Sequence, residues 1–265
     1  MLRVDGGTYS IQLLGVGKRY GDVVAVQDLS LEIRAGGIFG LLGANGAGKT
    51  TTIRMMSGLL KPSEGSVIVG GHDMAREPKA AKALCAYVPD QAFLYEHLTA
   101  QEMLEFVADI RGVEEPRKSR NIARYLEYFE LADRRDHLIE DFSHGMRQKL
   151  ALCSAFVYEP SIVYLDEPTN GLDPRSVRRL KCLLVAHCEA GGTVLLSTHI
   201  LEIAETLCET VAILRRGRLV ACGSVADLKA QTHERSLEDV FMGLTEEGVA
   251  EGRCTDEPTI MDASA

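Results

Sequence analysis

A glycine-rich segment with one lysine is the first part of the sequence whose residue types could do chemistry. It reads GANGAGKTT and fits the pattern G-x-x-x-x-G-K-[ST]. Glycines let backbone N–H groups turn towards phosphate oxygens, and a helix that starts here adds a favourable potential for anions. Lys49 would reach the terminal phosphates, and the Thr50 hydroxyl would ligate Mg²⁺. The residues expected to bind phosphates are Gly43, Ala44, Asn45, Gly46, Ala47, Gly48, Lys49, Thr50 and Thr51.

A pair of carboxylates forms the second candidate group. Asp166 and Glu167 directly follow the apolar run SIVYL. Carboxylates at the carboxyl end of a strand lie where ligands bind in open α/β sheets. Asp166 would hold Mg²⁺ directly or through water, and Glu167 could orient and deprotonate the attacking water. The alternatives, an acidic surface turn here and a merely flexible turn at the glycines, are weak when both motifs occur together.

A small polar turn precedes the apolar helix pattern of residues 146–156. It reads FSHGM and contains Ser143 next to His144. A serine beside a histidine could suggest a hydrolase nucleophile. No acid–base relay and no nucleophile-elbow pattern surrounds this pair, so a nucleophilic role is not favoured.

Short apolar runs alternate with helical patterns and would position these groups. The run LSLEI (29–33) alternates apolar and polar residues, which predicts a half-buried antiparallel strand. Three other runs are apolar throughout, which is typical of strands buried on both faces of a parallel sheet: IFGLL (38–42), SIVYL (161–165) and TVLLS (193–197). The sequence therefore predicts an α/β fold.

The middle and the end of the chain follow different patterns. Thr99 and Glu102 form a capping-box pattern, and a second helix is expected in SRNIARYLEYFEL (119–131). This region predicts a helical insertion in the α/β core. After Gly223 the pattern allows two short helices at most. The tail from Thr245 has six acidic residues and one arginine, which predicts disorder.

Composition excludes several classes of protein. The net charge is −9, which does not favour a nucleic-acid partner. Seven scattered cysteines with no Cys-x-x-Cys pair indicate free thiols rather than a disulfide framework or a zinc site. No apolar run approaches the roughly 18 residues that a membrane helix needs. We therefore expect a chain that does not itself cross a membrane.

Four motifs together resemble a known family. GANGAGKTT, FSHGMRQ, VYLDEPTNGLDP and LLSTH have the order and spacing of ATP-binding cassette (ABC) ATPases. The resemblance covers about residues 10–223. It implies a P-loop NTPase core with a parallel sheet, an N-terminal antiparallel β subdomain and an inserted α-helical subdomain at about 99–150. A short helical extension would follow at 224–244, and then the acidic tail at 245–265.

The resemblance also implies roles for individual residues. In this family two cassettes pack head to tail, and each ATP lies between one phosphate loop and the partner's signature helix. Ser143 and Gly145 match the groups that meet the γ-phosphate across that interface. Tyr20 matches the ring that stacks on adenine, His199 matches the switch histidine at the γ-phosphate, and Asp173 matches the loop that connects the two sites.

The sequence departs from the family pattern at two motifs. His144 stands where glycine is usual, and Met146 where glutamine is common. In the loop AYVPDQAFLYEHLT, the family places glutamine directly after a proline, but here Asp90 follows Pro89 and Gln91 comes next. Either side chain could accept a hydrogen bond from Mg²⁺-bound water. We favour Gln91 for that contact, with Asp90 as the alternative.

These features predict an ATP-hydrolysing subunit of an ABC transporter. It would form a homodimer on the cytoplasmic face of the membrane, attached through separate integral-membrane permease subunits. The ending SLEDVFMGLT and the form of the PDQAFLYEHLT loop resemble an export branch of the family. One alternative is a soluble ABC ATPase, such as an iron–sulfur assembly ATPase. Another is a regulatory cassette without turnover, against which Glu167 and His199 both argue.

Overall fold

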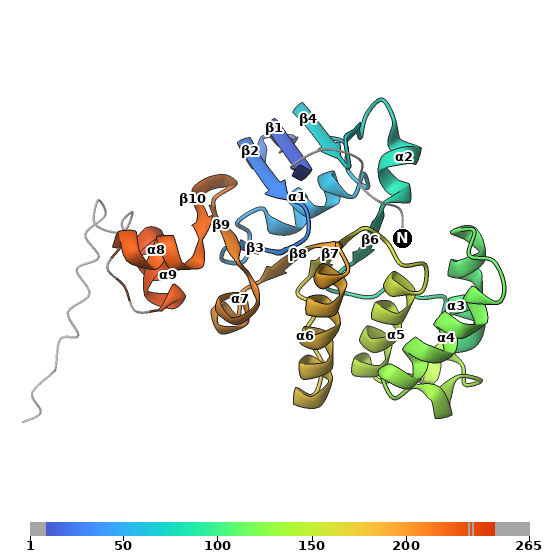
Figure 1. The fold of residues 1–265 in the computed structure, drawn as a ribbon. Helices are drawn as coiled ribbons and strands as arrows, with labels where there is room; N and C mark the ends of the chain where they lie inside the picture. Colours follow the sequence, from blue (N-terminus) through green and yellow to red (C-terminus); the bar gives the residue numbers. More distant parts are fainter. Residues whose placement is uncertain (1–8, 233, 235, 247–265) are drawn as a thin grey trace, which may run out of the picture.

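A computed structural model describes residues 9–232, 234 and 236–246. Within them the chain forms two sheets, with helices between the sheets and on the outer face of the larger one (Figure 1). The acidic tail that we predict to be disordered lies outside the described residues from 247 onward. No helix in the described part of the chain combines the length and the apolar character needed to span a membrane.

The larger sheet has six strands in the order β10-β9-β3-β8-β7-β6. All neighbouring strands pair in parallel except β10, which is antiparallel to β9. The strands are β3 (Ile38–Leu42), β6 (Cys85–Val88), β7 (Ile162–Asp166), β8 (Thr193–Thr198), β9 (Thr210–Arg215) and β10 (Arg218–Ser224). The predicted parallel sheet is therefore confirmed.

Strands β3, β7 and β8 are buried at every residue, because both faces of the sheet are covered. Side chains alternate between the faces of a strand. Ile38 and Leu42 accordingly belong to one hydrophobic core, and Phe39 and Leu41 to another. The first core lies against α5 (His144–Phe156), α6 (Pro174–Glu189) and α7 (Leu201–Leu207), and the second against α1 (Lys49–Met56) and the smaller sheet. This double cover explains why these runs are apolar throughout.

The smaller sheet is antiparallel, in the order β2-β1-β4-β5. Its strands are β1 (Tyr9–Tyr20), β2 (Val23–Arg34), β4 (Glu64–Val69) and β5 (His72–Asp73). In β2, Leu29, Leu31 and Ile33 are buried, whereas the residues between them are exposed. The expectation of a half-buried antiparallel strand at 29–33 is thus confirmed. Helix α2 (Pro78–Ala83) leads from this sheet to β6.

Three helices form most of the region between β6 and β7: α3 (Ala100–Ile110), α4 (Arg117–Tyr128) and α5. The predicted capping box is present at the start of α3. The Glu102 N–H donates to Thr99 Oγ1 at 3.2 Å, and the Thr99 N–H donates to Glu102 Oε2 at 2.8 Å. Among the described residues 99–150 no strand of the two sheets occurs. Treating 99–150 as a separate subdomain remains our proposal.

Two helices follow β10: α8 (Val225–Thr232) and α9 (Leu237–Glu246). Lys229 of α8 forms an ion pair with Glu205 of α7 at 2.6 Å. The other carboxylate oxygen of Glu205 accepts a hydrogen bond from the Leu237 N–H at 3.1 Å. Leu228, Leu237 and Val240 extend the core beyond α7. These contacts attach the C-terminal helices to the far side of the sheet from α3 and α4 (Figure 1).

Candidate functional site

The glycine-rich loop joins β3 to α1 and requires glycine for steric reasons. Gly48 caps α1 with φ 103°, and a Cβ atom there would lie 2.7 Å from the Ala25 carbonyl oxygen. Gly46 has φ +80°, but a Cβ there would meet nothing within 4 Å. No side chain caps α1. The first N–H groups of a helix have no partner within the helix. The loop therefore offers backbone donors to an anion, as the sequence predicts.

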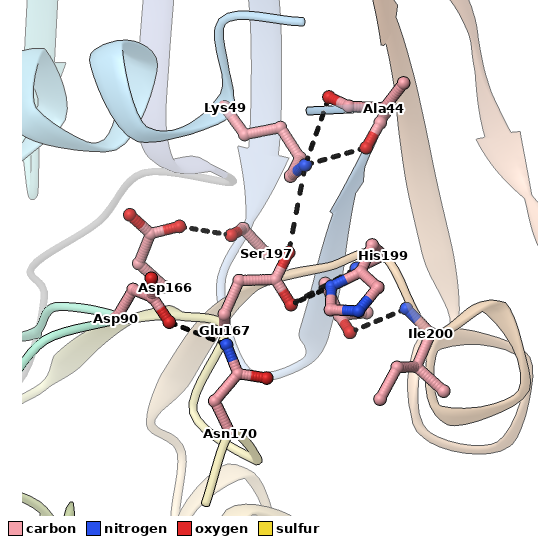
Figure 2. Close-up of polar contacts among 11 residues, drawn as sticks. Ala44, Lys49, Asp90, Asp166, Glu167, Asn170, Ser197, His199 and Ile200 are labelled. Carbon is pink, nitrogen blue, oxygen red and sulfur yellow. Dashed lines mark hydrogen bonds and ion pairs between the residues drawn. The ribbon is translucent and has the colours of Figure 1, made fainter. Parts of the chain in front are cut away.

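Lys49, the first residue of α1, is almost fully buried. Its Nζ donates hydrogen bonds to the carbonyl oxygens of Gly43 at 2.7 Å and Ala44 at 3.4 Å (Figure 2). The same Nζ lies 3.8 Å from Glu167 Oε1. A buried charge is stable only when it is paired and hydrogen-bonded. The cation is therefore held in place between the phosphate loop and the end of β7.

Asp166 ends β7 and is buried. Its Oδ1 accepts a hydrogen bond from Ser197 Oγ at 2.5 Å, and the two residues are register partners on β7 and β8. Its Oδ2 is buried and has no hydrogen-bond partner among the described residues. An unpaired buried carboxylate oxygen is costly. This oxygen is a suitable ligand for a hard divalent cation, which prefers oxygen donors.

Glu167 follows Asp166 and adopts φ 49°, in the left-handed region that non-glycine residues seldom occupy. Its N–H donates to the Ser197 carbonyl at 3.0 Å. Its Oε2 lies 2.8 Å from His199 Nδ1 and accepts the His199 N–H at 3.2 Å. An ionised carboxylate only accepts hydrogen bonds, so His199 Nδ1 carries the proton in this pair. Lys49 and His199 thus hold the two oxygens of Glu167 on opposite sides.

The turn that contains Ser143, His144 and Gly145 lies at the start of α5. Ser143 caps this helix, and its Oγ accepts the Met146 N–H at 3.3 Å. Ser143 and His144 are both exposed. A Cβ at Gly145 would lie 2.6 Å from the Gly171 carbonyl oxygen, so this turn packs directly on the segment after Glu167. The exposed end of α5 has the small polar residues that the sequence predicts for contact with a second chain.

Asp173 caps α6. It accepts hydrogen bonds from the Ser176 N–H at 2.9 Å and the Ser176 hydroxyl at 2.6 Å, and it forms an ion pair with Lys149 at 3.1 Å. These contacts, with the Ser176 hydrogen bonds first, hold the pKa of the Asp173 carboxyl well below its usual range. The contact with Lys149 joins the end of the segment after Glu167 to α5.

Tyr20 lies at the end of β1, away from the strand ends described above. Its ring is 49% exposed, and Lys18 Nζ lies 5.4 Å from the ring centroid. The ring is therefore not a core residue of the smaller sheet. Its exposed face is available for stacking, and the adenine contact remains a proposal.

The loop after β6 brings one of the two candidate residues to the site. Asp90 Oδ1 accepts a hydrogen bond from Asn170 Nδ2 at 2.6 Å (Figure 2). Gln91 is exposed and has no hydrogen bond among the described residues. Of the two, Asp90 is the one that contacts the segment after Glu167. Which of the two accepts a hydrogen bond from Mg²⁺-bound water stays a prediction.

Two polar residues of the site, Ser197 and Asn170, were missed in the sequence, and the contact made by a third, Gln148, was not expected. Ser197 is a polar residue at the carboxyl end of an otherwise apolar strand, and this position could have identified it. Gln148 is buried, and its Nε2 donates to the Pro168 carbonyl at 3.2 Å. A glutamine within the apolar helix pattern of α5 could have indicated such a contact. Asn170 carries no comparable signal.

An apolar cavity of about 410 Å³ lies beside the loop after β6, between that loop, α3 and α5. Phe93 and Ile110 line it and are 82% and 68% exposed. Met103, Val107 and Ala151 also line it. Exposed apolar surface of this kind marks sites where proteins bind each other.

Comparison with known proteins agrees with this site. Residues 26–170 match the family described as "ABC transporter". The chain is 38% identical over 223 residues to the daunorubicin/doxorubicin resistance ATP-binding protein DrrA of Streptomyces peucetius, covering 84% of this chain and 68% of that protein. It is 35% identical over 241 residues to the linearmycin resistance ATP-binding protein LnrL of Bacillus subtilis, covering 91% and 76%.

Solved structures give the same result. A structure described as the ATP-binding subunit of an ABC transporter superposes with a TM-score of 0.85 at 33% identity, covering 88% of this chain and 98% of that one. A second, at 25% identity and a TM-score of 0.75, is a dimeric ATP-binding cassette in a post-hydrolysis state, bound to ADP and Pi. It covers 81% of this chain and 98% of that one.

Proposed function

Because the chain belongs to the ABC transporter family, in which it is an ATP-binding and ATP-hydrolysing subunit, we propose how its residues perform that reaction. One observation carries the proposal. Lys49, Glu167 and His199 come from three distant parts of the sequence and meet at the carboxyl ends of β3, β7 and β8. Phosphoryl transfer needs a basic group that binds phosphate, a base that activates water, and here a histidine that orients this base.

ATP is bound mainly through its phosphates. The N–H groups of the loop from Gly43 to Thr51 surround them, and Lys49 Nζ exchanges its carbonyl contacts for the terminal phosphate oxygens. The exposed ring of Tyr20 stacks on the adenine. The phosphate contacts provide most of the binding, because they are charge-assisted hydrogen bonds.

Mg²⁺ fits the residues that are present. Asp166 Oδ2 is the buried oxygen without a partner, and the Thr50 hydroxyl follows Lys49 at the start of α1. These two oxygens would hold the ion. When bound, Mg²⁺ neutralises charge on the phosphate oxygens during transfer. Asp166 is fixed for this role by its hydrogen bond to Ser197.

Glu167 is the general base. Its carboxylate takes a proton from the attacking water, which lies in line with the bond to the leaving phosphate. His199 holds Oε2 of this carboxylate and presents its ring at the γ-phosphate. The two adjacent carboxylates have different partners, Ser197 for Asp166 and Lys49 with His199 for Glu167, which supports different roles.

The second half of the site comes from another copy of this chain. Two copies pack head to tail, so that Ser143 and Gly145 of one copy meet the γ-phosphate held by the other. The exposed N-terminal end of α5 supports this assignment, since it adds a favourable potential for an anion. Asp173, at the end of the segment after Glu167, connects the two sites. Hydrolysis removes the γ-phosphate that joins the copies.

The membrane partner docks in the apolar cavity at Phe93 and Ile110. The chain would then lie on the cytoplasmic face of the membrane, held by separate permease subunits. The relatives named for drug resistance support export as the direction of transport. The same relatives do not favour the alternative of an iron–sulfur assembly ATPase.

Glu167→Gln is the test of this proposal. The amide cannot take the proton, so turnover should fall by about a thousandfold while ATP binding is kept. The variant should accumulate as an ATP-bound dimer, measured by size-exclusion chromatography together with phosphate release. Glu189→Gln, at the exposed end of α6, is the matched control and should behave as the parent chain. Normal hydrolysis by Glu167→Gln would refute the assignment of the base.

A further inference from the structure

The backbone that carries Glu167 needs support from its surroundings. A non-glycine residue at positive φ is strained relative to the usual conformations. Glu167 has φ 49°, and its carbonyl oxygen accepts the Asn170 N–H at 3.1 Å, which closes a turn over Pro168 and Thr169. The position of the carboxylate therefore depends on what holds this turn.

Two side chains outside the turn hold it. Gln148 of α5 donates to the Pro168 carbonyl from within the core, where it is 1% exposed. Asp90 accepts from the Asn170 side chain at 2.6 Å, from the loop after β6. The first contact is part of the buried core. The second reaches the turn from a loop whose next residues are exposed.

The Asp90 contact is a strong one by chemistry. A carboxylate accepts hydrogen bonds and an amide NH₂ donates them, and a bond to an ionised acceptor is stronger than a neutral one. Both side chains are partly buried, which reduces competition from water. Asn170 is thus bound through its side chain to Asp90 and through its backbone to Glu167.

The loop that carries Asp90 continues to the apolar cavity. Phe93, three residues after Asp90, lines the apolar cavity. Gln91 lies between them, exposed and without a hydrogen bond among the described residues. One connection from the cavity to the base therefore runs through Asp90 and Asn170.

We propose that Asp90 is a positioning residue for ATP hydrolysis, which holds the turn that carries Glu167 through its hydrogen bond to Asn170. The proposal rests on the assignment of Glu167 as the base. It gives the carboxylate of Asp90 a function that does not require contact with the metal.

The test is a double-mutant cycle on the purified chain. Asp90→Ala and Asn170→Ala should each lower kcat by about tenfold, with KM for ATP changed less than about threefold. The double variant should be no worse than the poorer single variant, because both remove the same bond. Combining Asp90→Asn with Asn170→Asp exchanges donor and acceptor, and should restore kcat to within about threefold of the parent.

Two controls separate this role from others. His97→Ala changes an exposed residue of the same loop and should leave kcat unchanged. Melting temperatures of all variants should stay close to that of the parent. A drop in melting temperature with kcat and KM affected together would mean a purely structural bond, and would overturn the proposal.

Other outcomes also overturn it. If Asn170→Ala is silent while Asp90→Ala is damaging, or if the two effects add, Asp90 acts without Asn170. If Gln91→Ala is as damaging as Asp90→Ala and Asn170→Ala is silent, Gln91 holds the role. Glu167→Gln is measured in parallel, to separate this inference from the assignment of the base. If Glu167→Gln loses turnover while the Asp90 and Asn170 variants are normal, only this inference is overturned. If Glu167→Gln turns over normally, the base assignment is overturned as well.

Discussion

The two halves of the candidate site differ in how the chain holds them. At the ends of β3, β7 and β8, Lys49, Asp166 and Glu167 are 6%, 1% and 9% exposed and are held by internal contacts. At the start of α5, Ser143 and His144 are exposed. The first half is built within one chain, so we expect one chain to bind a nucleotide. The second half has its polar groups at the surface, where another molecule could reach them.

Lys49→Ala should break the first half with the largest effect. Removing the buried cation removes charge-assisted hydrogen bonds to phosphate, so the Kd for ATP should rise by about a hundredfold or more. The measurement is calorimetric titration of the isolated chain with ATP. Lys61→Ala, just after α1, is the control and should bind like the parent. Tight binding by Lys49→Ala would contradict the phosphate-loop assignment.

Ser143→Asp, at the exposed cap of α5, should break only the second half. The new carboxylate would face the γ-phosphate held by another copy, so ATP-dependent dimerisation of the Glu167→Gln chain should weaken by at least about tenfold. Binding of ATP to the single chain should change less than about threefold. Ser143→Asn is the matched control, because aspartate and asparagine both cap a helix as Ser143 caps α5.

Aspartate and asparagine differ in charge, so comparing the two variants isolates the effect of the negative charge on dimerisation. Dimerisation should be weaker with aspartate than with asparagine, as measured by sedimentation at fixed ATP. Equal dimerisation of the two would place the γ-phosphate away from this turn. Loss of ATP binding by the single chain would mean that the second half of the site cannot be changed without damaging the first.

Asp173→Asn should have the smallest effect, and one that depends on pH. The pKa of Asp173 is lowered in the folded chain, so the unfolded chain binds this proton more readily. Its contacts therefore stabilise the fold fully above about pH 5, and this stabilisation is lost as the pH falls through about 4 and below. The variant should lose stability less steeply than the parent between about pH 5 and pH 3, measured by urea unfolding.

An exposed aspartate provides the control for that measurement. Asp133→Asn, on the 3₁₀ turn after α4, should keep the parent's pH dependence. If Asp173→Asn and the parent have parallel curves, the ion pair with Lys149 and the bonds from Ser176 do not couple to folding. The contact between α5 and the segment after Glu167 would then contribute little to the stability of the fold.

The sequence predicts the sheet better than the contacts around it. IFGLL forms β3 with the expected bounds, and SIVYL and TVLLS match β7 and β8 to within one residue at each end. Burial on both faces leaves a local signal, because most residues of such a strand must be apolar. The capping box at Thr99 was equally local, since both partners lie within four residues.

Contacts between distant segments left no such signal. Asp90 and Asn170 are 80 residues apart, and Ser197 and Asp166 are 31 apart. Which of Asp90 and Gln91 turns inward depends on how the loop leaves β6, and the two types of side chain are equally suitable as acceptors. The roles of the site residues remain proposals for the same reason, since each depends on a ligand or a second chain.

The exposed ring of Tyr20 has a consequence for which nucleotide the chain can use. Stacking depends on the flat face of a base and not on the hydrogen-bonding groups at its edge. A guanine presents the same kind of face as an adenine. The phosphate loop would then distinguish triphosphates from diphosphates, while the choice between ATP and GTP would follow their concentrations in the cell.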